Sequence, residues 1–109
     1  MSSENNNGPG KSKVIEFLKV IMDPEFEIDI FNLGLIYGVR IDDGKVTVEM
    51  TTTSFGCPTA PFIEDMVKNT LKSINGVREV EVEWTFDPPW SPEMMTDEGR
   101  ELMESMGYL

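Results

Sequence analysis

The sequence predicts a two-layer α/β (α+β) domain with the element order α-β-β-α-β-α and a small mixed three-stranded sheet. Apolar residues recur at helical spacing in two stretches, 14–22 and 63–74. An Asp43-Gly44 pair separates two runs that alternate with the period of a strand. A third alternating run, 79–86, follows the second helix, which makes it parallel to the strand before that helix if both share a sheet.

The beginning of the chain changes from polar to helical at residue 12. Residues 1–11 are polar and rich in asparagine, which predicts a disordered tail followed by a single domain over residues 12–109. Ser12 is the expected N-cap of the first helix, and Pro24 is expected to end it, because the residue before a proline is pushed out of the α region. Apolar side chains in the acidic loop 24–34 predict that this loop lies against the core.

The hairpin can be tested for its register. A two-residue turn at Asp43-Gly44 places apolar residues opposite one another on one face only, and a slip of one residue would destroy this match. The pairs expected on that face are Ile41 with Val46, Val39 with Val48 and Tyr37 with Met50.

The second half of the chain continues the same pattern. The second helix buries a stripe of apolar residues and ends at Asn75-Gly76. The third strand points its glutamates to solvent, and helices are expected to cover the other face of the sheet. Whether this strand lies beside the second or the first is left open. Trp90 is expected to cover the core, and Thr96 to cap a short final helix.

Composition excludes several classes of function. The 109 residues fit one small domain, and there is no histidine, which excludes a Ser-His-Asp triad within one chain. The net charge of −11 argues against binding to nucleic acid or to an anionic membrane, and the longest nearly apolar stretch, 33–39, is too short to span a bilayer. An acidic surface that docks a basic partner remains an alternative to simple solubility. A domain of this size has only a modest core, so a homodimer that buries more surface is possible.

A single cysteine, Cys57, is the main candidate for chemistry. One cysteine forms no disulfide within the chain, and the opening segment contains no apolar run, so a reducing cytoplasm is expected. With Pro58 as the first helical residue, Cys57 would lie at the helix N-terminus, where unpaired N–H groups favour a thiolate. Gly56 would let the backbone approach a ligand. The nearby hydroxyls belong to Thr51, Thr53 and Ser54. The alternative is a small buried apolar residue.

The thiolate would serve as a soft metal ligand rather than as a hydrolytic nucleophile, because no histidine can act as its base. An iron–sulfur cluster is normally held by four thiolates, so no tightly bound cofactor is expected. A transient iron or cluster at Cys57, completed by a partner or by small thiols, is possible. Asp23 and Glu25 could be oxygen ligands or a partner contact. Alternatively, they are exposed carboxylates of a turn that ends the helix.

Four motifs in order resemble the SufT-like and PaaD-like iron–sulfur cluster assembly accessory proteins, also called metal–sulfur cluster biosynthetic proteins. They are DPE at residues 23–25, NLGLIY at 32–37, TTTSFGCP at 51–58 and DPPWSPEMM at 87–95. The resemblance covers residues 14–107 and implies an iron–sulfur-assembly-type fold. It identifies Cys57 with the reactive cysteine of the family and Asp23 and Glu25 with its acidic motif. Phe55 stands where the family usually has proline.

The resemblance also implies a role in maturing cytosolic iron–sulfur proteins, as an adaptor or carrier rather than as an enzyme. The expected partners are the assembly machinery and client apoproteins. The PaaD-like branch offers an alternative, a dedicated assembly subunit of an oxygenase or catabolic complex. A thiol enzyme is a third hypothesis, which a lone cysteine without a resolving partner argues against.

Overall fold

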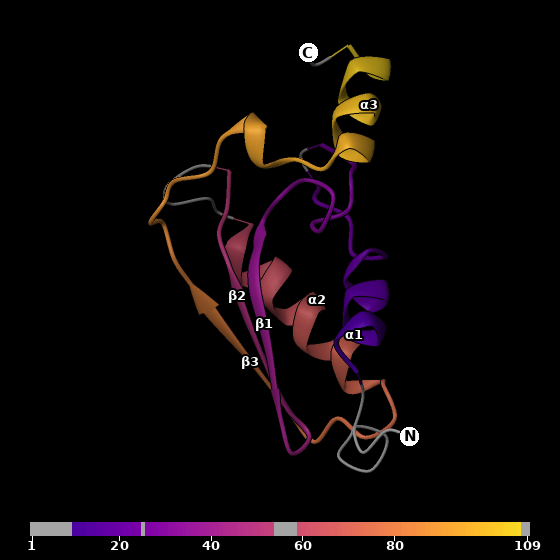
Figure 1. The fold of residues 1–109 in the computed structure, drawn as a ribbon, viewed down its shortest axis with the longest axis vertical. Helices are drawn as coiled ribbons and strands as arrows, with labels where there is room; N and C mark the ends of the chain where they lie inside the picture. The colour runs from indigo at the N-terminus through magenta and orange to yellow at the C-terminus, as the bar shows by residue number, and fades with distance from the viewer. Residues whose placement is uncertain (1–9, 25, 54–58, 108–109) are drawn as a thin grey trace.

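The computed structural model describes residues 10–24, 26–53 and 59–107 of the 109-residue chain. In chain order its elements are α1 (Lys11–Leu18), β1 (Ile36–Asp42), β2 (Lys45–Met50), α2 (Ala60–Lys72), β3 (Glu79–Trp84), the 3-10 helix η2 (Pro92–Met94) and α3 (Asp97–Ser105). The sheet order is β1-β2-β3, with β1 antiparallel and β3 parallel to β2 (Figure 1). The predicted fold class is confirmed, and the strand order that the sequence left open places β3 beside β2.

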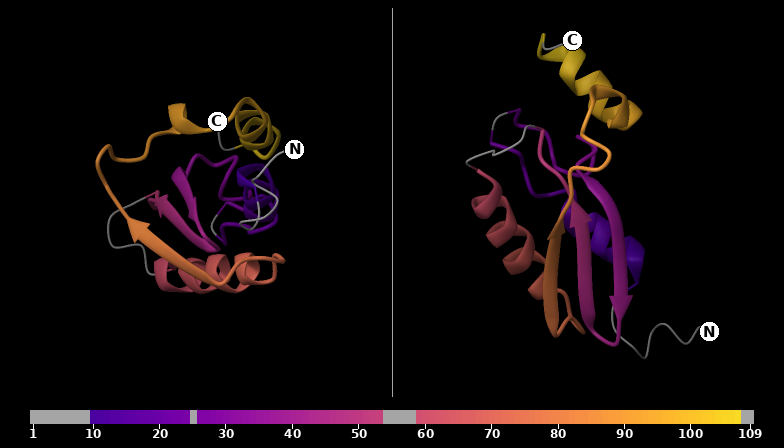
Figure 2. Two further views of the ribbon diagram at one scale, coloured as in Figure 1. Left: turned by 60° about the horizontal axis from the view of Figure 1, so that its bottom comes forward. Right: turned by 90° about the vertical axis from the view of Figure 1, so that its left-hand side faces the viewer.

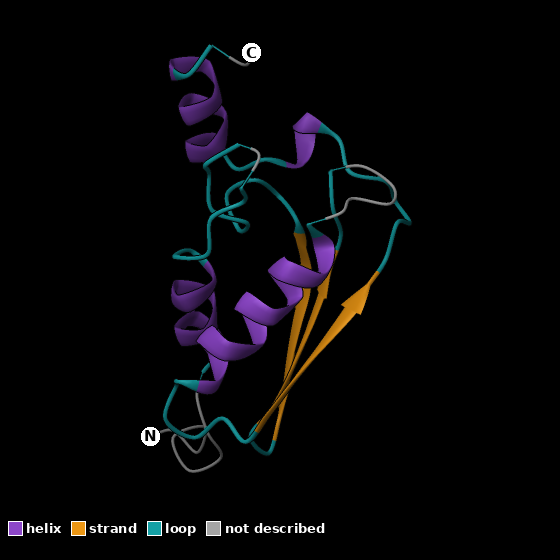
Figure 3. Ribbon diagram, turned by 180° about the vertical axis from the view of Figure 1, so that it is seen from behind, coloured by secondary structure: helices purple, strands orange, loops and turns teal. Residues whose placement is uncertain are grey.

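Helices cover only one face of the sheet. The three views agree that α1 and α2 lie side by side on that face, while α3 projects beyond the end of the sheet (Figures 1, 2 and 3). The opposite face meets solvent and carries the predicted glutamates, two of which form exposed ion pairs, Arg40–Glu83 at 2.9 Å and Lys45–Glu81 at 3.0 Å. No helix in the described ranges has the length and apolar character that crossing a membrane requires.

The core lies between the helices and the sheet, as the apolar pattern predicts. From α2 and the residues just after it, the buried side chains are Ile63, Val67, Leu71 and Ile74. The loop before β1 contributes Ile28, Ile30 and Leu33, each fully buried, which confirms that this loop lies on the core. Trp90 also packs against the core and donates from Nε1 to the Leu33 carbonyl at 2.8 Å, as its predicted covering role requires.

The limits of α1 differ from the prediction. Its N-cap is Gly10 rather than Ser12, and Lys11, assigned to the tail, is its first residue. The helix ends at Leu18, well before Pro24, because the next residues pair with the following loop. Ile30 donates its N–H to the Ile21 carbonyl at 2.9 Å. This pairing takes the place of the last helical turn, which the position of Pro24 by itself would allow.

The hairpin confirms most of the predicted register. Asp43 and Gly44 both have positive φ, 50° and 84°, as a two-residue turn of this kind requires. The pairs of Ile41 with Val46 and of Val39 with Val48 are present, but the predicted pair of Tyr37 with Met50 is wrong. Ile36 pairs with Met50 instead, and a β-bulge between Ile36 and Gly38 leaves Tyr37 as the extra residue.

The two remaining α-helices, α2 and α3, have threonine at the N-cap position. α2 begins at Ala60 with Thr59 as its N-cap, two residues later than the expected start at Pro58, and Pro61 lies in its first turn. The position of Cys57 itself lies outside the described residues. Thr96 caps α3 as predicted and accepts a hydrogen bond from Gly99 N at 3.0 Å.

Candidate functional site

The predicted cysteine site lies on the connection between β2 and α2. Five of its residues, 54–58, are outside the described ranges, and they include Ser54, Gly56, Cys57 and Pro58. The structure therefore places the site by its flanks. β2 and β3 are parallel and joined through α2, so the connection leaves the carboxyl end of a strand and enters the amino end of a helix. Ligands of open α/β sheets usually bind at this edge.

Of the three hydroxyl residues predicted near the cysteine, Thr51 and Thr53 are described, and they differ in exposure. Thr51 is fully buried. Its N–H donates to the Leu35 carbonyl at 2.9 Å, and its Oγ1 donates to the Thr52 carbonyl at 3.4 Å. The backbone of Thr51 therefore anchors the end of β2 to the loop before β1, and its side chain is buried. Thr53 is half-buried and is the last residue of the connection that is described before residue 54.

Asp23 is buried, with 3% of its surface exposed, and it organises a tight turn. Its N–H donates to the Ile28 carbonyl at 2.9 Å, and its own carbonyl accepts from Glu27 N at 2.8 Å. Its Oδ1 accepts from Phe26 N at 3.3 Å. The alternative of an exposed carboxylate is therefore wrong for Asp23, because the carboxylate closes the turn. Glu25 lies outside the described residues.

The Asp23 turn and the flanks of the cysteine connection share one end of the molecule. Figures 1 and 2 both show the loop between α1 and β1 at the end where β2 finishes and α2 begins. The fold thus brings the loop that holds Asp23 to the end of the molecule where β2 finishes and α2 begins, which are the two described flanks of the cysteine connection. The sequence alone does not show that these two connections are close, because they are separated along the chain.

Glu64 on α2 connects this edge to β3. Trp84 at the end of β3 donates from Nε1 to Glu64 Oε1 at 2.7 Å, and Lys68 forms an ion pair with Glu64 at 3.0 Å. The Trp84 hydrogen bond, followed by the Lys68 contacts, lowers the pKa of the Glu64 carboxyl. The start of α2 is therefore tied to the strand beside it.

The described residues alone do not assemble a metal site. In residues 10–24, 26–53 and 59–107, no three cysteine, aspartate or glutamate side chains come close enough to hold an ion. Asp23 accepts a hydrogen bond within its turn through Oδ1, and its role as an oxygen ligand stays a prediction. The single thiol that the chain offers to a metal is that of Cys57, whose surroundings are not described.

Two features of the structure were not predicted. One is a buried polar network, in which Asn32 donates from N and Nδ2 to the two carboxylate oxygens of Asp29, at 2.9 and 2.8 Å. Thr96 Oγ1 donates to Asn32 Oδ1 at 2.5 Å, which joins this loop to the start of α3. Asn32 belongs to a motif already recognised, but nothing local indicates its partners.

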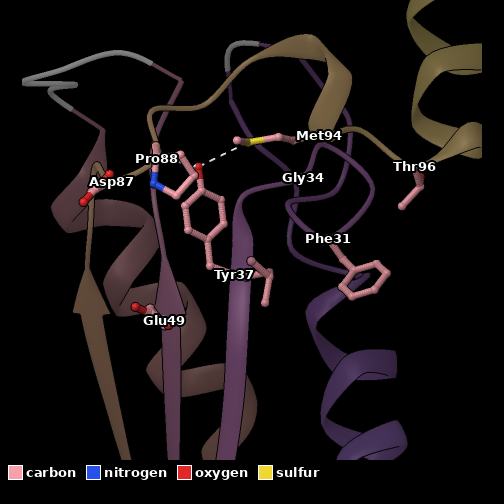
Figure 4. Close-up of a pocket in the computed structure, with 9 residues that line it drawn as sticks. Phe31, Gly34, Tyr37, Glu49, Asp87, Pro88, Met94 and Thr96 are labelled. Atoms are coloured by element: carbon pink, nitrogen blue, oxygen red, sulfur yellow. Dashed lines mark hydrogen bonds between the residues drawn. The ribbon is translucent and has the colours of Figure 1, made fainter.

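The second unpredicted feature is a pocket of about 600 Å³ beside the bulge of β1 (Figure 4). Its wall includes Tyr37, Glu49, Asp87 and Met94. Burial raises the pKa of the Tyr37 phenol, so the hydroxyl remains a donor at neutral pH. A glycine inside a strand often marks a bulge, so Gly38 was the signal that could have placed Tyr37 outside the regular register.

Comparison with known proteins gives the family. A family described as "Iron-sulfur cluster assembly protein" matches residues 11–84, from the first residue of α1 to the last of β3. The chain belongs to this iron–sulfur cluster assembly protein family. The predicted resemblance is confirmed. The matched region contains the Asp23 turn and the cysteine connection, while η2 and α3 follow it.

The alignments between this iron–sulfur cluster assembly protein and its relatives cover most of each relative's length. A Porphyromonas gingivalis protein named Fe-S protein maturation auxiliary factor is 39% identical, over 88% of this chain and 90% of its own. The Fe-S protein maturation auxiliary factor SufT of Staphylococcus aureus is 49% identical, over 71% of this chain and 89% of its own. A crystal structure from Bacillus anthracis, of a domain of unknown function, superposes with a TM-score of 0.81 at 37% identity, covering 91% of this chain and 92% of the other.

Proposed function

We propose that this protein is an accessory factor in iron–sulfur cluster assembly that helps to mature iron–sulfur proteins of the cytoplasm. The family match over residues 11–84 carries the proposal, because it includes both the DPE and the cysteine segments. The maturation factors named among its relatives align over most of their length with this chain. A reducing compartment is required, because the lone thiol must stay unoxidised to act.

The proposed mechanism rests on Cys57 as the ligand or contact for iron, a cluster or a client. One chain supplies one cysteine, whereas a cluster is normally held by four thiolates. A cluster on this protein therefore takes its other ligands from a second chain, a partner or small thiols. Such incomplete ligation favours release, so the protein acts as an adaptor or transient carrier and not as an enzyme. Its net charge of −11 assists docking of basic partners.

Complementation of a deletion strain tests the role of the thiol. Cys57→Ser removes the soft ligand at nearly constant size, so it should fail to restore the activity of iron–sulfur enzymes while its own abundance stays normal. Ser105→Ala, an exposed change of similar size at the end of α3, should restore activity fully. Full restoration by Cys57→Ser would eliminate the proposed thiol mechanism.

Anaerobic purification with iron and sulfide analysis tests the carrier role. The wild-type protein, incubated with iron, sulfide and glutathione, should acquire a cluster that passes to an added apoprotein. Cys57→Ser should acquire none. Equal loading of the two proteins would show that the cluster binds elsewhere. Co-purification with several client proteins would support a general factor, whereas one stoichiometric enzyme partner would support a dedicated subunit.

A further inference from the structure

The pocket beside Tyr37 lies at the end of the solvent-facing side of the sheet. In Figure 4 the Tyr37 ring stands in the middle, with Phe31 on one side and with Asp87 and Glu49 on the other. The wall is drawn from three parts of the chain: the loop before β1, the strands, and the segment 87–96. The predicted cysteine site includes none of these four side chains, Phe31, Tyr37, Glu49 and Asp87.

The wall of this pocket is held in place by direct contacts. The Tyr37 hydroxyl lies 2.8 Å from the Pro88 carbonyl oxygen and 3.2 Å from Met94 Sδ, and its single proton is donated to either of these acceptors. Gly34 has a φ of +85°, and a Cβ added there would collide with the Met94 carbonyl, so the two segments pack closely. The pocket therefore exists before any partner binds, as is usual for binding sites.

The charged side chains that line the pocket are both acidic, Glu49 and Asp87. Neither forms an ion pair with a described residue, and no lysine or arginine stands among the described lining residues. Arg40, whose charge acts on Glu49, already pairs with Glu83 at 2.9 Å. The pocket thus presents two carboxylates that form no ion pair within the described part of the chain, on a protein with a net charge of −11.

The other side of the pocket is apolar. It includes Phe31, and Figure 4 shows the Tyr37 ring between Phe31 and the carboxylates. Ile36 adds a further apolar side chain to the lining. The Phe31 ring already has the Lys19 ammonium 5.2 Å from its centroid. A second cation is therefore favoured at the carboxylate end, and an apolar group at the Phe31 end.

We propose that this pocket binds an arginine side chain of a partner polypeptide, together with an apolar residue next to that arginine. A guanidinium is planar, stacks on aromatic rings such as Tyr37 and donates in a fork to carboxylates, whereas a lysine ammonium is a more strongly hydrated point charge. A polypeptide fits better than a small cation, because the apolar half of the wall needs a partner of its own. The inference rests on the proposed function, since an adaptor must hold other proteins.

A peptide titration followed by amide chemical shifts tests this proposal. The probe is acetyl-Leu-Arg-amide, and its matched control is acetyl-Leu-citrulline-amide, which has the same shape without the charge. The arginine peptide should produce saturable shifts at Phe31, Tyr37 and Glu49, with at least tenfold weaker binding of the citrulline peptide. Acetyl-Leu-Lys-amide should bind several-fold more weakly than the arginine peptide. Equal binding of either control would overturn the proposal.

Variants separate the pocket from the general negative charge. Glu49→Gln and Asp87→Asn should each weaken the arginine peptide by threefold or more. Glu79→Gln removes the same charge at the opposite end of the sheet, where Glu79 is the neighbour of Lys45 in the β2–β3 register. This variant should change binding less than twofold. An equal loss in Glu79→Gln would refute the pocket. The assay contains neither cluster nor client, so its failure leaves the role of Cys57 standing, and failure of the thiol tests leaves the pocket standing.

Discussion

Replacing Asn32 by alanine should destabilise the protein through a buried network and without touching the predicted thiol site. The change removes the donor at 2.8 Å from Asp29 Oδ1 and the acceptor of Thr96 Oγ1. Asp29 and Asn32 expose only 7% and 4% of their surfaces. Leaving the buried Asp29 carboxylate without one of its donors costs about 1–3 kcal/mol of stability. Loss of the hydrogen bond from Thr96 costs about 0.5–1.5 kcal/mol more. The expected loss in unfolding free energy is about 2–4 kcal/mol.

Urea unfolding measured by tryptophan fluorescence provides the assay. Trp90 reports on this region directly, because its indole donates to the carbonyl of Leu33, the residue after Asn32. The matched control is Asn69→Ala on the exposed side of α2, which should be neutral or stabilising by up to about 0.5 kcal/mol, since alanine is the better helix former. If Asn32→Ala lost less than about 1 kcal/mol of unfolding free energy, with an unchanged dependence on urea concentration, the argument that these buried polar groups need their hydrogen-bond partners would be refuted.

A double-mutant cycle would assign part of this loss to the contact with α3. Thr96→Val removes both the cap of Gly99 N and the bond to Asn32. The coupling between Asn32→Ala and Thr96→Val should be about 0.5–1.5 kcal/mol, the size of one hydrogen bond. Strict additivity would mean that the two side chains do not interact in solution.

Three further outcomes follow from the described contacts. Gly34→Ala should cost about 2 kcal/mol in urea unfolding, because a positive φ and the Met94 carbonyl both oppose a Cβ. The pKa of Glu64 is lowered by Trp84, so its stabilisation exists above the usual glutamate pKa of about 4.3 and is lost as pH falls through the lower folded-state pKa. Glu64→Gln should flatten that part of the pH–stability curve; an unchanged curve would exclude the contribution. Arg40→Ala should leave the urea midpoint almost unchanged, because its ion pair is exposed to solvent, and a clear drop in the midpoint would contradict this.

Local rules predicted the type and order of the regular elements correctly, although not the limits of α1 or the start of α2. The Asp43-Gly44 turn, the stripe on α2 and the Thr96 cap depend on residues a few positions apart, and the structure confirms each of them. The candidate thiol site likewise came from residue types, since a lone cysteine between glycine and proline is visible in the chain itself. Those residues lie outside the described ranges, so that part stays a prediction.

Only the tertiary structure decided the features that depend on distant pairing. α1 stops at Leu18 because Ile21 pairs with Ile30, and Asp23 is buried by the same loop. Tyr37 leaves the hairpin register and bonds to Pro88, 51 residues later, which creates the pocket. Such contacts form between segments whose meeting is set by packing of the whole chain, so periodicity and turn chemistry, which act over a few residues, carry no information about them.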